Sequence, residues 1–268
     1  MIRKPRLKHG ELGVHVLRFS RDELAAVPAV HRSFYLLMGQ FNNELTILQG
    51  LTLQAVQSVR GPDTVREPTL GMMLFFVRLM SGRLYELWQT INSRENGKLL
   101  DELWQTDVMR NIDQSPYDAG IAGRKQLNKY FGRGALLGKI RNKLAYHLDQ
   151  SQMDEGFALL PNDISLSDFH TGIRGTTFFG AADTVTLYAI AHLAELDDAL
   201  DAAKRLVDEA LKAFVAAVDF IEAYLAAFTI SFYGLERFAS MPIEVLRDAP
   251  VVGSTRLHFF LRPKKSGA

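Results

Sequence analysis

Cysteine is absent from all 268 residues of this chain. Its absence excludes disulfides, thiolate metal ligands and cysteine nucleophiles together, and it is compatible with a reducing cytoplasm, where we expect the protein. A charge excess of one sign is also lacking, because 31 basic and 30 acidic residues leave a formal net charge of +1. The overall charge therefore does not indicate a nucleic-acid-binding protein, and any such argument must come from local patches.

Long uninterrupted apolar runs are lacking as well. The run Met72–Met80 is short and is interrupted by Arg78, and the run over 214–232 carries Asp219 and Glu222. Neither is typical of a membrane span, which needs about 20 predominantly apolar residues. The basic N-terminus is followed by no apolar segment, so we expect neither a secretory signal nor a membrane partner.

Motifs for metals and cofactors are scarce. His192 and Glu195 are spaced one helical turn apart, but they lack the Glu-x-x-His order of di-iron helical bundles. The stretch Gly172–Gly175 lacks the strand–turn–helix context of a phosphate-binding loop. We therefore expect no metal site and no cofactor.

The sequence does contain strong helical periodicity. Apolar residues recur at spacings of three and four along most of the chain, which is typical of amphipathic helices. The predicted helices span 31–60, 68–91, 98–112, 124–149 with a break near 132–134, 183–192 and 196–232. This pattern predicts an all-α protein, an antiparallel bundle of about four to six helices with a loop-rich insertion and short β segments.

The predicted domain organisation has three parts. Residues 1–30 form an N-terminal arm, and residues 234–268 form a C-terminal extension. Residues 31–233 form the helical bundle, which is interrupted by an insertion at 151–182. Within the insertion, residues 156–180 are rich in glycine, threonine, serine and aromatic residues, which is not typical of a helix.

Local signals refine this outline. Residues 14–19 and 256–261 predict short strands, and Ser20–Glu23 has the form of a capping box that opens a helical turn. Residues 113–123 contain Pro116 and two glycines, which favours a loop. Residues 156–180 are expected to form a long loop with one or two short strands.

The segment Leu136–Asp149 has the most regular pattern in the chain. Its apolar stripe consists of Leu137, Ile140, Leu144 and Leu148. Arg141 and His147 fall on opposite edges of that stripe. Since six residues separate them, they lie ~120° apart around an α-helix and ~9 Å apart along it. A single helix would not bring both to one atom, whereas two copies around a two-fold axis can, so we expect a homodimer.

The stretch Arg141-Asn142-Lys143-Leu144-Ala145-Tyr146-His147 places a polar residue after an arginine and a histidine six positions after it. It resembles the R-x(4–6)-H signature of the HEPN superfamily, which sits on a late helix of an all-helical bundle. The wider sequence looks most like the HEPN branches of abortive-infection and toxin–antitoxin systems. The specific resemblance covers about Lys139–Asp149. The same bare pattern at Arg3–His9 has no predicted helix around it and carries no weight.

This resemblance implies a metal-independent endoribonuclease in phage defence or a toxin–antitoxin system. It implies three catalytic residues: His147 as acid and base, Arg141 as a clamp on the phosphate, and Asn142 as an orienting group. The chemistry is physically sound, because histidine titrates near pH ~6.5 and arginine offers a fixed fork of donors to phosphate oxygens. The implied products carry 2′,3′-cyclic phosphate and 5′-hydroxyl ends.

Other residues are candidates for supporting roles. Glu86, with Glu44 as the alternative, is the candidate carboxylate partner of Arg141, and Tyr146 is a candidate for stacking on a base. Between Asp118 and Asp149 there is no acidic residue, whereas seven basic residues occur there: Arg124, Lys125, Lys129, Arg133, Lys139, Arg141 and Lys143. Among them, we expect Lys139, Lys143 and Arg133 to contact an RNA backbone. The alternative is a solvated helix face balanced by the acidic stretch at 195–201.

Asp149 departs from one variant of the family. Some HEPN toxins carry a tyrosine two residues after the histidine, where a partner nucleotidyltransferase modifies them, so that mode of neutralisation is not expected here. An antitoxin or regulatory protein of another kind remains open as a partner, besides RNA and a second copy of the chain. Two alternatives also remain: a catalytically inactive HEPN-type binding or dimerisation module, and an unrelated helical bundle in which the motif is coincidental.

Overall fold

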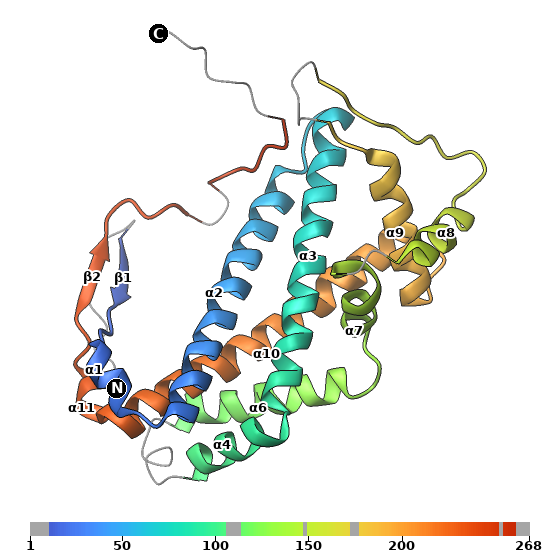
Figure 1. The fold of residues 1–268 in the computed structure, drawn as a ribbon. Helices are drawn as coiled ribbons and strands as arrows, with labels where there is room; N and C mark the ends of the chain where they lie inside the picture. The colour runs from blue at the N-terminus through green and yellow to red at the C-terminus, as the bar shows by residue number, and fades with distance from the viewer. Residues whose placement is uncertain (1–10, 106–113, 147–148, 172–176, 252–253, 261–268) are drawn as a thin grey trace. The chain divides into compact units, whose positions relative to one another are not determined.

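The chain is predominantly helical, which confirms the predicted all-α class (Figure 1). The computed structural model describes residues 11–105, 114–146, 149–171, 177–251 and 254–260. Within that part of the chain the helices are α1 Arg21–Ala26, α2 Ala29–Ser58, α3 Asp63–Ile91, α4 Arg94–Gln105, α6 Gln114–Phe131, α7 Leu136–Ile140, α8 Gln150–Ala158, α9 Gly180–Ala194, α10 Ala199–Tyr233 and α11 Leu235–Ala239. A π-helix, here called the π segment, spans Arg141–Ala145, and strands β1 Leu12–His15 and β2 Ile243–Leu246 form a two-stranded sheet.

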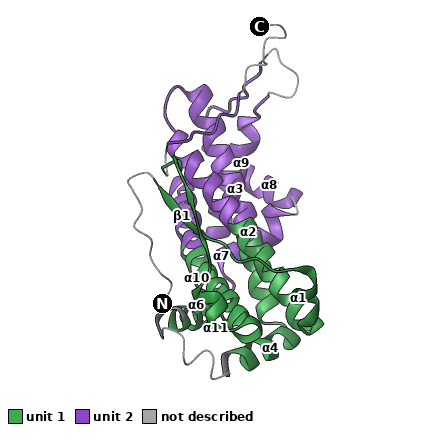
Figure 2. Cartoon of the chain, turned by 90° about the vertical axis from the view of Figure 1, so that its left-hand side faces the viewer, with its two compact units in different colours: residues 1–45, 83–133, 212–251 green, residues 46–82, 134–211, 252–268 purple. Residues whose placement is uncertain are grey.

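The chain divides into two compact units, shown in different colours in Figure 2. Unit 1 comprises residues 1–45, 83–133 and 212–251, and unit 2 comprises residues 46–82, 134–211 and 252–268. The long helices α2, α3 and α10 each contribute to both units, so each unit is assembled from stretches that are far apart in the sequence.

Unit 1 ties the N-terminal arm to the C-terminal extension. Strands β1 and β2 pair antiparallel, with Leu12 opposite Leu246 and His15 opposite Ile243. The predicted capping box is confirmed, because Ser20 and the side chain of Glu23 each accept from the other's backbone N–H. Arg237 of α11 donates to the same Glu23 carboxylate, and this hydrogen bond holds the pKa of Glu23 at about 2. The strand predicted within 14–19 begins two residues earlier, at Leu12.

The core of unit 1 is aromatic where α2 meets α10. Phe34 packs edge-to-face on Tyr224, with the ring centroids 5.0 Å apart, and Tyr35 stacks on Phe228 at 4.0 Å. Helix α6 also approaches α10 closely, since a Cβ built at Gly123 would lie 2.4 Å from the carbonyl oxygen of Ala216. A side chain at that position would force the two helices apart.

The loop predicted at 113–123 is wrong, because α6 begins at Gln114. Pro116 falls in the first turn of the helix, where a backbone N–H has no intrahelical acceptor and its loss costs little. Gly123 permits the close approach to α10 described above, so it reflects packing rather than a turn. The predicted break at 132–134 is confirmed, and Gly134 adopts the left-handed conformation with φ 68°.

Helix α10 is, among the described residues, the one long and apolar enough to cross a membrane. However, 61% of its most apolar 18-residue window is buried inside the structure. A core helix of a globular protein has the same length and composition, so this feature alone is weak support for a membrane span.

Unit 2 is built around α9. Helix α8 crosses it so closely that a Cβ at Gly156 would lie 2.4 Å from the carbonyl oxygen of Val185. The predicted loop over 156–180 therefore starts later than expected, because α8 continues to Ala158. In the described part of the remaining loop, Phe169 and Phe178 form an isolated antiparallel bridge.

The strand predicted at 256–261 is not present in its described part, residues 256–260. This segment instead lies on unit 2 through two contacts. The backbone N–H of Leu257 donates to Ser58 Oγ at 3.1 Å, and Phe259 packs edge-to-face on Phe178.

Candidate functional site

The motif segment of unit 2 is not the single α-helix that its periodicity predicts. It is α-helical from Leu136 to Ile140 and π-helical from Arg141 to Ala145, and Asp149 then caps the separate helix α8. The apolar stripe is confirmed where it is described, since Leu137, Ile140 and Leu144 are all buried. His147 and Leu148 lie outside the described residues, so the position of the candidate acid–base group stays a prediction.

The π segment places Arg141 beside two other residues of the motif. Arg141 Nη1 donates to Asn142 Oδ1 at 3.1 Å, and Arg141 Cζ lies 6.0 Å from the centroid of the Tyr146 ring. Tyr146 follows Arg141 by five residues, which is the spacing that a π turn brings into register because its hydrogen bonds run from i to i+5. Such π turns occur frequently at functional sites. Asn142 is therefore in a position to orient the guanidinium, as its predicted role requires.

The ring of Tyr146 lies against α3 at a glycine. A Cβ built at Gly82 would lie 2.5 Å from Cε2 of the ring, so any larger residue would displace it. Tyr146 as a whole is also 40% exposed to solvent. Tyr146 is thus fixed on one side by α3 and accessible on the other, as its predicted role in stacking on a base requires.

Arg78 of α3 reaches the same segment and was not predicted as a site residue. Its Nη1 donates to the carbonyl oxygen of Leu144 at 3.4 Å, near the end of the π segment. Burial lowers the pKa of Arg78, and the charge of Asp183 on α9 partly offsets this. Burial likewise raises the pKa of Asp183, and the charge of Arg78 opposes that rise. The two charged groups therefore stabilise each other within unit 2.

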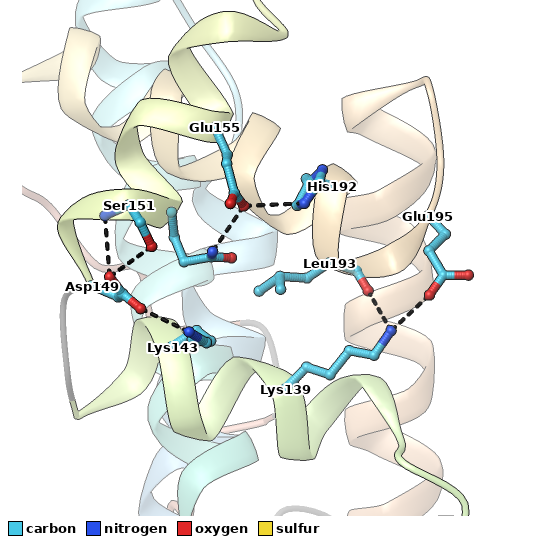
Figure 3. Close-up of polar contacts among 9 residues, drawn as sticks. Lys139, Lys143, Asp149, Ser151, Glu155, His192, Leu193 and Glu195 are labelled. Atoms are coloured by element: carbon cyan, nitrogen blue, oxygen red, sulfur yellow. Dashed lines mark hydrogen bonds and ion pairs between the residues drawn. The ribbon is translucent and has the colours of Figure 1, made fainter.

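Lys143 and Asp149 join the π segment to the start of α8, as Figure 3 shows. Lys143 Nζ lies 2.8 Å from Asp149 Oδ2, and the carbonyl oxygen of Lys143 accepts from the Asp149 N–H at 3.2 Å. The other carboxylate oxygen of Asp149 accepts from the backbone N–H and the hydroxyl of Ser151. These bonds, the one from Lys143 first, hold the pKa of Asp149 at about 2, and Asp149 in turn raises the pKa of Lys143.

Lys139 is held by α9 and the residue that follows it. Its Nζ donates to the carbonyl oxygen of Leu193 at 3.2 Å and to Glu195 Oε1 at 2.8 Å. The hydrogen bond from Lys139 lowers the pKa of Glu195. Two of the three residues predicted to bind RNA, Lys139 and Lys143, are therefore already paired with carboxylates.

A second polar cluster, which Figure 3 also shows, joins α8 to α9. Glu155 Oε2 accepts from Gln152 Nε2 at 2.8 Å and lies 3.1 Å from His192 Nε2. The sequence singled out His192 only in relation to Glu195, one turn away. In the structure His192 instead pairs with Glu155, because α8 packs on α9.

The remaining predicted residues, Glu86 and Arg133, belong to unit 1. Glu86 Oε2 lies 2.9 Å from Arg83 Nη1, and Arg83 also binds Glu44 with a distance of 2.6 Å from Nε to Oε2. The pairing of Glu86 with Arg141 stays a prediction. Arg133 is exposed just after the end of α6.

Two site features carried a usable signal in the sequence. Asp149 and Gln152 have the spacing of a helix cap, Asp-x-x-Gln, which marks the start of α8. Arg78 interrupts the apolar run of α3, and a charged residue in such a run indicates a polar or charged partner nearby. The change from α-helix to π-helix carried no such signal, since Leu137, Ile140 and Leu144 satisfy an ordinary helical period.

Comparisons with known proteins found no match: no family model matches this chain, and neither does any curated protein or any solved structure.

Proposed function

We propose that the protein is a metal-independent endoribonuclease of the HEPN type that acts as a homodimer in phage defence or a toxin–antitoxin system. The observation that supports it most is the π segment, which sets Arg141 beside Asn142 and the ring of Tyr146 within the motif. A guanidinium is the side chain best suited to bind a phosphate through charge-assisted hydrogen bonds.

The reaction assigned to this site needs no metal or cofactor. A base takes the proton of an RNA 2′-hydroxyl, and the 2′-oxygen attacks the adjacent phosphorus. The bond from phosphorus to the 5′-oxygen breaks as an acid gives that oxygen a proton, which leaves a 2′,3′-cyclic phosphate and a 5′-hydroxyl. His147 serves as the acid–base group, and Arg141 stabilises the charge that develops on the phosphate.

The alternative function is a HEPN-type binding or dimerisation module without catalysis. One observation favours it: Lys139 and Lys143 are bonded to Glu195 and Asp149, so the motif contributes less unpaired positive charge than its sequence indicates. A nuclease with this motif then depends on cations elsewhere in the chain to hold its substrate.

The test is the initial rate of cleavage of a fluorescent RNA by purified variants with EDTA present. We expect His147→Ala to lower the rate by about 10²–10⁴-fold, the usual contribution of a general acid or base. We expect Arg141→Ala to lower it by about 10²-fold or more, as for other groups that stabilise developing negative charge.

Two matched controls belong to the same experiment. His192→Ala removes another histidine of unit 2, and Arg66→Ala removes an exposed arginine of α3 that pairs with Asp63. Both are expected to cleave at the wild-type rate. Equal rates for all five proteins would contradict the proposed site, and a wild type without activity would favour the binding module.

A further inference from the structure

Three exposed basic residues of unit 1 form a row, here called the basic ridge: Lys125, Lys129 and Arg133. Lys125 and Lys129 lie on α6, four residues and therefore about 6 Å apart along its axis. Arg133 follows four residues later, directly after the helix, where the Gly132 N–H still donates to the carbonyl oxygen of Asn128. All three residues are exposed.

Ion pairs separate these three from three of the other four basic residues between Asp118 and Asp149. Arg124 lies 3.0 Å from Asp101 of α4, and Lys139 and Lys143 bind Glu195 and Asp149. By contrast, the ridge residues make no ion pair with any residue in the described ranges. Arg141 aside, the positive charge of this stretch that no described carboxylate balances therefore lies on the C-terminal half of α6 and just after it.

Helix stabilisation does not account for the whole ridge. Cations near a helix C-terminus interact favourably with the helix dipole, and this explains Lys129 and Arg133. Lys125 lies before the last turn of α6, so the dipole does not explain it. The acidic residue of α6 on the same side is Asp118, seven residues before Lys125 and thus about 10 Å away, where salt screens much of its effect.

The neighbours of the ridge are polar rather than apolar. Gln126, Asn128 and Gly132 are the other exposed residues between Lys125 and Arg133. Asn128 is fixed by the indole of Trp88, whose Nε1 donates to Asn128 Oδ1 at 3.1 Å. A protein interface is built around a buried apolar or aromatic centre, whereas the one exposed large apolar side chain in the described part of α6, Ile121, lies a turn before Lys125. A row of cations and amides instead matches a strand of regularly spaced phosphates.

We propose that the basic ridge binds the backbone of single-stranded RNA, and that Lys139 and Lys143 of the motif do not. The choice of RNA as the ligand rests on the proposed function. The location of the binding surface rests only on the ion pairs that the neighbouring basic residues make and the ridge residues lack. Binding of this kind positions a strand without reading its sequence, so it should tolerate any base composition.

The experiment measures binding of the full chain to a fluorescein-labelled 2′-O-methyl oligouridylate by anisotropy. This RNA cannot be cleaved through its blocked 2′-oxygen, so binding is measured independently of catalysis. The triple variant Lys125→Ala, Lys129→Ala and Arg133→Ala is compared with a control that loses the same charge from exposed positions of unit 1: Arg21→Ala, Arg94→Ala and Lys98→Ala. A third variant, Lys125→Arg, Lys129→Arg and Arg133→Lys, keeps all three charges.

We expect the ridge variant to bind at least tenfold more weakly than wild type at low salt, while the control and the charge-preserving variant bind as wild type. Between 50 and 200 mM salt, the slope of log K against log salt should be shallower by about 2, because each phosphate contact on a single strand contributes about 0.7. Thermal unfolding of each variant verifies that the fold is kept.

Either of two results would contradict the ridge proposal. The ridge variant and the control could lose the same amount of RNA affinity, or the wild type could fail to bind the RNA at low salt. The two proposals fail separately. If the ridge binds RNA but the protein never cleaves it, the ridge proposal holds and the nuclease proposal fails. If the ridge variant binds RNA with unchanged affinity and still cleaves it, the nuclease proposal holds and the ridge proposal fails.

Discussion

Lys143 and Asp149 are joined twice, through a side-chain contact of 2.8 Å and a backbone hydrogen bond of 3.2 Å. The two bonds fix the middle of the π segment to the start of α8, and the candidate catalytic histidine stands between the two residues in the sequence. The same carboxylate caps α8 through the backbone N–H of Ser151. Asp149 thus both forms an ion pair with Lys143 and caps α8, and substitutions can separate these two contributions.

Replacing Asp149 by asparagine should remove the ion pair but keep a capping side chain, whereas alanine should remove both. We therefore expect Asp149→Ala to lower the melting temperature more than Asp149→Asn. The pKa of Asp149 is about 2 in the folded chain against an ordinary value of 3.8. Its stabilising contribution is therefore complete above pH about 4 and is lost as the pH falls towards 2.

The measurement is chemical unfolding of wild type and Asp149→Asn across that pH range. The difference between them should be constant above pH about 4 and should shrink below it. Asp154→Asn is the matched control, because it removes an exposed carboxylate of the same helix that makes no ion pair with a described residue. It should show no such dependence. A difference that persists unchanged at low pH would show that the ion pair is not its source.

Gly82→Ala should impair the candidate site without unfolding unit 2. The new Cβ would lie 2.5 Å from the Tyr146 ring and would displace it from its position beside Arg141. We expect a lower rate of RNA cleavage, measured as initial rates with EDTA present. Gly50→Ala is the matched control: nothing lies within 4 Å of its Cβ, so it should raise stability by about 0.5–1 kcal/mol and leave the rate unchanged. Equal rates of RNA cleavage for the two variants would show that the position of Tyr146 does not matter for the reaction.

Arg78→Met should destabilise the fold in a pH-dependent way. Burial already raises the pKa of Asp183, and loss of the Arg78 charge should raise it further. A raised carboxyl pKa makes ionisation costly in the folded state, so the loss of stability should appear as the pH rises above about 4 and be larger at pH 7. Denaturant unfolding at both pH values measures this loss.

The double variant Arg78→Met/Asp183→Asn tests the cause of that loss. With the carboxylate removed, it should be more stable at pH 7 than Arg78→Met alone. If Asp183→Asn gives no recovery, the loss comes from the hydrogen bond of Arg78 to the Leu144 carbonyl oxygen instead.

Much of the helical fold could be predicted because its cause is local. Leu137, Ile140 and Leu144 recur at helical spacing, and all three are buried. The capping box at Ser20 and Glu23 could be recognised for the same reason, since its two hydrogen bonds span three residues. Periodicity and caps are properties of a short window, so they can be read from the sequence without knowledge of the fold.

What could not be predicted depends on partners far away in the chain. The pairing of β1 with β2 joins Leu12 to Leu246, and no local pattern indicates that choice. Gly123 has the local sequence context of a loop residue, but it is required by the close passage of α10, which lies far away in the sequence. The neutralisation of Lys139 likewise depends on Glu195, which α9 brings near. The basic stretch of the sequence therefore overstated the charge available at the motif.

The most direct test of the account is the chemistry of the RNA ends produced by purified wild type and His147→Ala with EDTA present. The account predicts 2′,3′-cyclic phosphate and 5′-hydroxyl ends from wild type, and none above background from His147→Ala. Ends with a 3′-hydroxyl, cleavage abolished by EDTA, or the same cyclic ends from His147→Ala would each contradict it.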